Sequence, residues 1–226
     1  FIKIQISAGV TSIGERAFYN CYRLIEVYNL SDLPITAGSS DYGYVGYYAE
    51  SVYTDTATPS KQSVTEDGYV FYVDGDKRYL LGYVGTESEI TLPADCDGGA
   101  YAIYDYAFYG NTTLTGIAIP NSVTSIGSYA FNGCSSLTSI AIGNGVTSIG
   151  SSIFGSTAYY HDSSNWENGV LYIGKYLLEA KTSIASSYEI KNGTSVFASN
   201  AFSYCSSLTS VTIPDSVTSI GSYAFA

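Results

Sequence analysis

A repeat of 23 residues organises this 226-residue chain and constrains its fold more than any other feature. Two neighbouring copies, residues 114–131 (LTGIAIPNSVTSIGSYAF) and 137–154 (LTSIAIGNGVTSIGSSIF), differ at few positions, and residues 208–225 (LTSVTIPDSVTSIGSYAF) repeat the pattern. A marker phenylalanine keeps the period at positions 108, 131 and 154, and again at 202 and 225. Self-similarity with this period is typical of solenoids, in which stacked coils share one core.

Each copy has the hydrophobic pattern of a strand followed by a turn and a return segment. Ile140 and Ile142 alternate as in a strand that turns one face inward. The turn residues Gly143-Asn144-Gly145 then predict a return along a second wall through Val146 and Ile149. One coil offers about seven large inward side chains, and their burial does not offset the ordering of its backbone. We therefore predict a β-rich solenoid of stacked coils with a parallel sheet on one face.

The repeated motif also points to a family. The consensus IPxSVTSIGxxAFxxCxxLTSI, carried by residues 10–27, 103–154 and 196–226, resembles the BspA-like leucine-rich repeat family of bacterial and protozoan surface proteins. The resemblance implies a right-handed leucine-rich solenoid, an extracellular or cell-surface location, and a non-enzymatic role in adhesion or protein binding. The expected partners are host matrix proteins or other cell-surface proteins, with glycans as a further candidate, and no cofactor is expected. A carbohydrate-binding module that uses Tyr-rich loops and a purely structural spacer are the competing functions.

The period is interrupted in two places. Regular coils occupy about residues 8–27, 103–154 and 190–226, and irregular modules occupy about 28–102 and 155–189. We expect residues 1–226 to form one continuous solenoid fragment. Apolar runs separated by Gly-containing turns predict two β-hairpin interruptions, at about 69–82 and 170–178. Loops are expected before the hairpins, at 31–67 and 155–168, and loops of this length are usually functional or mobile.

Charge is distributed unevenly along the chain. The formal net charge is −11, and residues 1–110 carry −9 of it, from 15 acids and 6 bases. No charged residue lies between Asp105 and Asp162, where Ser, Thr, Asn and Gly supply the polarity. Because nucleic acids and anionic membranes require a basic surface, neither is an expected partner. The sequence also lacks an apolar run of about 18 residues, which argues against membrane insertion.

Candidate partner-binding residues come from two kinds of surface. Tyr and Trp combine apolar area with a hydrogen-bonding group, which suits binding sites. The aromatic candidates are Tyr42, Tyr44, Tyr47 and Tyr48 in the first loop and Trp166 in the second. The alternative is that these tyrosines pack against their own module. The second surface is the outward face of the predicted sheet, a row of hydroxyls that includes Thr138, Ser139, Thr209 and Thr212. The alternative there is a face kept small by the repeat consensus.

No residue pattern predicts a catalytic, cofactor or metal site. His161-Asp162 is a His–carboxylate neighbour pair, but no nucleophile elbow such as GxSxG accompanies it, and we interpret it as a surface loop. The segments Asp74-Gly75-Asp76 and Asp95-Cys96-Asp97 are similar to the first residues of a calcium loop. An EF-hand pattern that starts at Asp74 would require Glu at its twelfth position, residue 85, which is Gly. Both segments are therefore interpreted as turns.

Two further repeat positions carry structural expectations. The third residue after the marker phenylalanine is Cys21, Cys134 or Cys205 in three coils. We expect buried thiols instead of disulfides, because none of these has a cysteine at the same position of the adjacent coil. Four coils place Gly four residues before the phenylalanine, which suggests a bend with positive φ. Tyr104 and Ala198 stand there in two other coils, so either the bend accepts other residues or these coils turn differently, which we favour.

Overall fold

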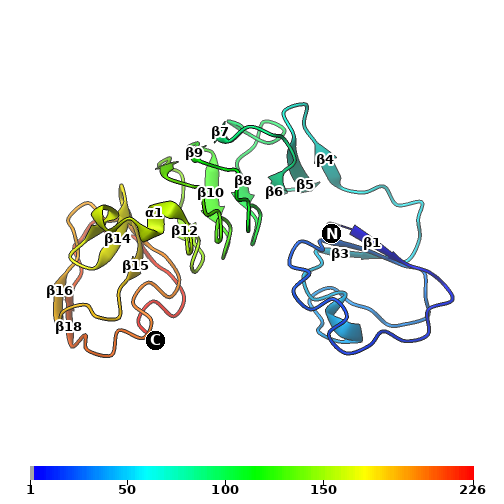
Figure 1. Ribbon diagram of the computed structural model, residues 1–226. Coiled ribbons are helices and arrows are strands. Elements are labelled where there is room, and N and C mark those ends of the chain that lie inside the picture. The colour runs from blue at the N-terminus through cyan, green and yellow to red at the C-terminus, as the bar shows by residue number, and fades with distance from the viewer. Residues whose placement is uncertain (1–2) are drawn as a thin grey trace. The chain divides into compact units, whose positions relative to one another are not determined.

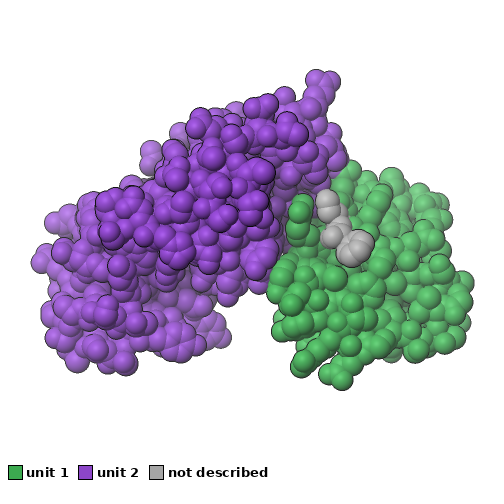
Figure 2. All heavy atoms as spheres, viewed as in Figure 1, with its two compact units in different colours: residues 1–62 green, residues 63–226 purple. Residues whose placement is uncertain are grey.

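The computed structural model describes residues 3–226, and the chain divides into two compact units, residues 1–62 and 63–226 (Figure 2). Strands predominate, and the described helices are single turns: η1 (Tyr42–Tyr44), α1 (Ala158–His161) and η2 (Ser163–Asn165). Within residues 3–226 no helix has the length and apolar character needed to cross a membrane. The predicted β-rich solenoid is confirmed, and the continuity of one solenoid through both units stays a prediction.

Unit 1 is built on a parallel sheet of three strands, β1 (Lys3–Ile6), β2 (Glu26–Asn29) and β3 (Ser51–Tyr53). The register pairs Lys3 with Glu26 and Glu26 with Ser51, so each strand occupies the same place in consecutive coils. The prediction of a loop at 31–67 is therefore wrong for its first part, residues 31–53, which complete a coil and end in β3. The chain from β2 to β3 forms a coil that buries Ile35 and Val45, although its sequence has left the repeat consensus.

Unit 2 has parallel strands on two walls (Figure 1). The first wall holds β7 (Glu89–Thr91), β9 (Gly116–Ile119) and β11 (Ser139–Ile142), with Ile117 paired to Ile140 one period on. The second wall holds β8 (Tyr101–Ile103), β10 (Val123–Ile126) and β12 (Ser148–Ile149). One sheet is expected from the sequence, but the VTSI return segment forms a second, because its Val and Ile are buried in the same way.

Both predicted hairpins are present. Strand β5 (Tyr69–Asp74) pairs antiparallel with β6 (Lys77–Tyr83), and β14 (Val170–Ile173) pairs antiparallel with β15 (Tyr176–Ala180). Gly75 and Gly174 open the two-residue turns with φ of 60° and 57°, where a side chain would be strained. The second strand of each hairpin then joins the VTSI wall in parallel, β6 beside β8 and β15 beside β17 (Val196–Phe197). Each hairpin thus supplies the strand from which a parallel series follows, β6 before β8, β10 and β12, and β15 before β17 and β19.

The remaining strands are short and complete these sheets. They are β4 (Gln62–Val64), β13 (Trp166–Glu167), β16 (Ser187–Glu189), β18 (Ser210–Thr212) and β19 (Ser219–Ile220). Strand β4 lies beside β5, and β13 pairs with β14. Strand β16 pairs with β18 and β17 with β19, both in parallel, so the coil architecture resumes after the second hairpin.

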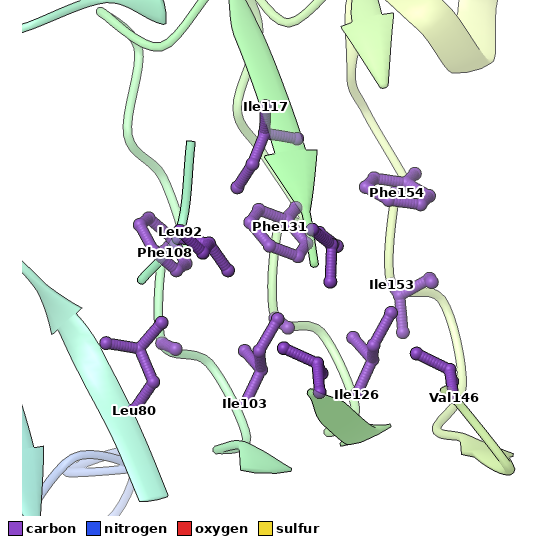
Figure 3. Packing of buried hydrophobic residues seen from close by; sticks show 14 of the residues in the cluster. Leu80, Leu92, Ile103, Phe108, Ile117, Ile126, Phe131, Val146, Ile153 and Phe154 are labelled. Carbon is purple, nitrogen blue, oxygen red and sulfur yellow. The ribbon is translucent and has the colours of Figure 1, made fainter. Parts of the chain in front are cut away.

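The core consists of columns in which one repeat position is stacked on itself (Figure 3). Phe108, Phe131 and Phe154 stack with ring centroids 4.9 and 5.3 Å apart, close to the ~4.8 Å spacing of neighbouring strands. A second column contains Leu80, Ile103 and Ile126, of which Leu80 comes from the hairpin strand β6. Phe131 is covered by Phe108 on one side and by Phe154 on the other, so the burial of its ring depends on both neighbouring coils.

The corner that carries the marker phenylalanine also repeats. Two residues before it the backbone has positive φ, between 50° and 61°, in every coil with the marker; the residues are Arg16, Tyr106, Tyr129, Ser152, Asn200 and Tyr223. The amides of Tyr129 and Phe131 donate to the carbonyl oxygens of Ser151 and Ile153 in the next coil, at 3.0 and 2.9 Å. A left-handed residue other than Gly costs about 1–2 kcal/mol, so this ladder of hydrogen bonds must maintain the conformation.

In three coils the glycine four residues before the marker allows close packing of the coils, and its φ is not positive. Gly127, Gly150 and Gly221 have no positive φ, and a Cβ atom on any of them would lie within 3.0 Å of backbone atoms in the preceding corner. Tyr104 and Ala198 directly follow β8 and β17, whose wall neighbours are the hairpin strands β6 and β15, and these continue as strands without such a corner. In these two coils the residues two positions before the marker, Tyr106 and Asn200, still have positive φ. The expectation that these coils turn differently is therefore wrong, and the bend accepts residues other than glycine.

Candidate functional site

Five tyrosines form a continuous series of rings on unit 1, which we name the tyrosine ladder: Tyr19, Tyr44, Tyr47, Tyr48 and Tyr22, in that order. Successive ring centroids lie 4.8–5.3 Å apart, and the ring planes meet at 62–88°. This edge-to-face arrangement is one that aromatic pairs prefer. Three of the rings come from the segment around η1 and two from the preceding coil, so the ladder exists only when the two coils are stacked.

The ladder is partly open to solvent. Tyr19 is 51% exposed and Tyr47 is 45% exposed, whereas Tyr44 and Tyr48 are half-buried. The guanidinium carbon of Arg16 lies 5.5 Å from the centroid of the Tyr19 ring and places a cation at this end of the ladder. Burial, followed by the neighbouring tyrosines, raises the pKa of Tyr48 to about 12, so its hydroxyl is protonated at neutral pH. The ladder therefore presents aromatic surface with one basic group beside it.

The structure divides the tyrosines of the predicted binding loop. Tyr42 packs against the core of unit 1, as the alternative interpretation expects. Tyr44, Tyr47 and Tyr48 join the ladder, and their contact with a partner stays a prediction. Sequence reasoning missed Tyr19 and Tyr22 because they belong to a regular coil. The repeat position of Tyr19 could have indicated its exposure, because Tyr19 directly follows the marker Phe18 and therefore lies at the outer corner of its coil.

Trp166 in β13 is half-buried in unit 2 and held from several sides. Its Nε1 donates to the carbonyl oxygen of Tyr160 at 2.8 Å, and the Tyr160 ring meets it edge-on at 5.1 Å. The ammonium of Lys181 lies 4.7 Å from the ring centroid. These contacts account for the position of the indole within its own unit, and its role in partner binding stays a prediction.

The predicted hydroxyl face is present. Thr138, Ser139, Thr209 and Thr212 are all exposed, at or beside the strands β11 and β18. Two of these hydroxyls also bind the scaffold: Thr138 Oγ1 donates to the carbonyl oxygen of Thr115 at 3.3 Å, and Thr209 Oγ1 donates to that of Ser186 at 2.9 Å. Each bond connects a coil to the one before it, which supplies a structural reason for threonine in the consensus. Partner binding by this face stays a prediction.

The acidic segments form turns in the structure, and the His–Asp pair lies at the junction of the short helices α1 and η2. Asp162 Oδ1 accepts hydrogen bonds from the amide of Ser164 at 2.9 Å and its hydroxyl at 2.8 Å, and these bonds lower the pKa of Asp162. His161 is the exposed last residue of α1. Asp95 Oδ1 accepts from the amide of Gly98 within a turn. Within residues 3–226, no group of three or more His, Cys, Asp or Glu residues is arranged to hold a metal ion.

The predicted thiols are free and serve the repeat. Cys96, Cys134 and Cys205 are buried and Cys21 is half-buried. Cys134 Sγ donates to the carbonyl oxygen of Phe108 at 3.1 Å. Thr157, at the same repeat position, donates to the carbonyl oxygen of Phe154 at 2.8 Å, so this position takes a small side chain that binds backbone. Burial raises the pKa of Cys134 to about 11.

A buried carboxylate that sequence reasoning missed anchors the last segment of unit 1. Glu26 in β2 is fully buried and accepts hydrogen bonds from the Ser60 hydroxyl (2.6 Å), the Lys61 amide (2.8 Å) and the Gln62 side-chain amide (2.6 Å). A buried charge is tolerated only with such donors. These bonds hold residues 60–62 against β2, and only the tertiary structure reveals them.

A polar groove of about 620 Å³ lies in unit 2 beside the second hairpin, and we name it the hairpin groove. Its lining includes Tyr129, Ser152, Glu179, Lys181, Asn200 and Tyr204. The hydroxyl of Tyr160, also in the lining, donates to Glu179 Oε1 at 2.7 Å. Burial raises the pKa of Glu179, and the Tyr160 hydrogen bond partly opposes this. Tyr204 is 82% exposed at the edge of the groove.

The stacked coils, the two parallel walls and the phenylalanine column define a leucine-rich-repeat solenoid. The sequence profile described as "BspA type Leucine rich repeat region" matches residues 1–38 and 101–226, in six copies. The match covers well over half of the chain, and the chain belongs to the BspA-type leucine-rich-repeat family. No curated protein matches the chain significantly.

Several solved structures are similar to the chain. A leucine-rich-repeat protein of T. pallidum is 27% identical, with 74% of this chain and 65% of that one covered and a TM-score of 0.41. A leucine-rich cell surface protein of Faecalibacterium prausnitzii is 29% identical, with 76% and 47% covered and a TM-score of 0.42. A leucine-rich-repeat protein of Bacteroides capillosus is 18% identical, with 72% and 99% covered and a TM-score of 0.38. The chain thus corresponds to less than two thirds of the length of the first two.

Proposed function

We propose that the chain is the repeat scaffold of a non-enzymatic extracellular or cell-surface protein that mediates adhesion or protein–protein interaction. Membership of the BspA-type family supports a scaffold that presents surfaces to other proteins. The observation that carries the proposal is the tyrosine ladder, an aromatic surface that extends over two coils of unit 1. The partner is a matrix protein or another cell-surface protein.

The chemistry of the ladder suits protein binding. Tyr and Arg are enriched among the residues that dominate interface energetics. A tyrosine loses little conformational entropy on binding because it has two side-chain torsions, and packing within the ladder already restricts them. Tyr19 and Tyr47 offer exposed ring surface next to the Arg16 cation. An incoming protein would cover these rings and leave the buried members unchanged.

Binding of the full chain to a panel of immobilised matrix proteins, measured by biolayer interferometry, tests the proposal. We expect at least one partner, and a loss of about tenfold or more in affinity for the double variant Tyr19→Ser, Tyr47→Ser. Serine fits the first position, because Ser203 follows the marker phenylalanine of a later coil. The matched control is Tyr109→Ser, which also follows a marker phenylalanine and is 53% exposed, but lies in unit 2.

Three outcomes would contradict the proposal. Absence of binding to every matrix protein and to a second cell type would favour a structural spacer. Equal losses in the double variant and in Tyr109→Ser would show that the ladder is not the contact surface. Full affinity in a correctly folded double variant, as judged by circular dichroism, would do the same.

A further inference from the structure

The hairpin groove exists because the second hairpin replaces a coil. In the regular stack the corner of one coil bonds directly to the next, as Phe131 N does to the carbonyl oxygen of Ile153. After Phe154 the chain enters α1 and the hairpin, and β15 runs straight where a corner would otherwise lie. The stack resumes through Ala180 N, which donates to the carbonyl oxygen of Ala201. The missing corner leaves the groove between Ser152 on one side and Asn200 on the other.

An aromatic ring forms one wall of the groove. Two residues before the marker, Tyr106 and Tyr129 stack in consecutive coils with centroids 5.0 Å apart and an interplanar angle of 12°. The next coil has Ser152 at this position, so the column of rings ends at Tyr129, where the groove begins. Tyr204 supplies a second, highly exposed ring. A flat apolar face of a ligand can pack against such rings.

A carboxylate supplies the strongest hydrogen-bond acceptor of the groove. Glu179 is half-buried at the end of β15, and within the described chain its one hydrogen-bond donor is the Tyr160 hydroxyl. An ionised carboxylate has about four acceptor sites, so Glu179 retains capacity for ligand hydroxyls. Serine, threonine and asparagine side chains from residues 152, 182, 183, 199, 200 and 203 line the same groove. Hydroxyl donors on a ligand would therefore meet acceptors on several sides.

The composition of the lining excludes other ligand classes. Two aliphatic side chains, Leu178 and Ala180, are too few for a lipid or a hydrophobic peptide. Lys181 is the one cation in the lining, and the Glu179 carboxylate in the same lining offsets its charge, so the groove has no net positive charge to attract an anion. The volume of about 620 Å³ falls within the ~300–1,000 Å³ range of small-molecule sites. A ligand rich in hydroxyls with flat C–H faces meets all these conditions.

We propose that the hairpin groove is a binding site for a neutral glycan. Pyranose rings of the glycan pack on Tyr129 and on Tyr204, and their hydroxyls donate to Glu179 and bond to the serine, threonine and asparagine groups of the lining. The site lies in unit 2 and uses none of the residues of the tyrosine ladder. It therefore adds a second binding activity and does not depend on the proposed protein partner.

The test is titration of the full chain with four tetrasaccharides, cellotetraose, chitotetraose, mannotetraose and maltotetraose, by isothermal calorimetry. We expect at least one to bind with a Kd of about 1 mM or less. Tyr129→Ser and Glu179→Gln should each weaken that binding about tenfold, because they remove the stacking face and the charged acceptor. Serine is tolerated at position 129, since Ser152 adopts the same left-handed backbone at the same repeat position.

The repeat provides a matched control. Tyr223 occupies the position of Tyr129 in a later coil, lies outside the groove and is 76% exposed, so Tyr223→Ser should bind the saccharide within about twofold of the wild type. Tyr204→Ser provides a groove variant on an exposed side chain that leaves the core intact, and it should weaken binding. Failure of all four saccharides to bind, or equal binding by wild type and the folded groove variants, would overturn the proposal. Binding of a hexalysine peptide in place of every saccharide would overturn the glycan class.

Discussion

Replacing Gly150 by Ala tests the inference that the corner glycines permit close approach of consecutive coils. The φ of Gly150 is not positive, so alanine itself is conformationally allowed there. The added methyl group would lie within 3.0 Å of Ser128 backbone atoms in the preceding corner. Carbon and nitrogen atoms at ordinary contact are about 3.5–4.0 Å apart, so the two coils must separate by on the order of 1 Å.

Separation of the two coils would lengthen and weaken the hydrogen bonds between them. Gly150 N donates to the carbonyl oxygen of Ile126 at 2.8 Å, and Ser151 N donates to Ser128 Oγ at 3.2 Å. Overpacking costs about 1–3 kcal/mol, and each weakened hydrogen bond adds up to ~1 kcal/mol. The lower entropy of alanine in the unfolded chain offsets about 0.4–1 kcal/mol. The free energy of unfolding should therefore fall by about 2–3 kcal/mol.

Urea denaturation followed by far-UV circular dichroism and by the fluorescence of Trp166, which lies in the same unit, measures this change. The matched control is Gly14→Ala, at the same repeat position in unit 1, where a Cβ atom would meet no atom within 4 Å. It should leave stability unchanged or raise it by up to about 1 kcal/mol. Equal destabilisation by both substitutions, or a neutral Gly150→Ala, would refute the close-approach explanation.

Three further predictions follow from the buried polar groups. Glu26→Ala leaves the donors of residues 60–62 without their acceptor, so the free energy of unfolding in urea should fall by about 2–3 kcal/mol, and by less in Glu26→Gln, which keeps an acceptor oxygen. Unchanged stability in Glu26→Ala would contradict this prediction. In the native protein near pH 8, Ellman's reagent should modify the half-buried Cys21 first, whereas the buried Cys134, whose pKa is about 11, should react only when the protein unfolds. The opposite order of reaction would show that Cys134 is accessible. The pKa of Tyr48 is about 12 in the folded protein and about 10 in the unfolded chain, so the unfolded chain loses this proton first and stability should fall as the pH rises from about 10 to 12. Tyr48→Phe should remove this part of the pH dependence, and an unchanged slope in that variant would exclude Tyr48 as its source.

The regular part of the fold is encoded locally and can be read from the sequence. The marker column of Phe108, Phe131 and Phe154 appears in the structure as a stack with one ring per coil. Both hairpins occur where turn residues interrupt the period. These predictions succeed because a solenoid is stabilised by contacts between consecutive coils, so a short stretch of sequence contains most of the relevant partners.

The corner glycines show where local reasoning fails. Their recurrence at one repeat position suggests a backbone angle, yet the constraint comes from the neighbouring coil, which leaves no room for a Cβ atom at Gly127 or Gly150. The left-handed corner residues, by contrast, are tyrosine, serine or arginine in five of the six coils, and only Asn200 is of a type that favours positive φ. Both features depend on how two coils stack, which the residues of one coil do not specify.

The period, the solenoid class, the positions of the hairpins and the family all follow from the residues alone. The candidate sites, in contrast, depend on how the coils stack. Tyr19 and Tyr22 meet Tyr44, Tyr47 and Tyr48 only because an irregular segment folds as a coil and stacks on a regular one. The hairpin groove arises where β15 supplies a wall strand but no corner. Repetition is a property of each coil and is visible in sequence, whereas a binding surface here is a departure from repetition, and its shape depends on which neighbour fills or leaves the space.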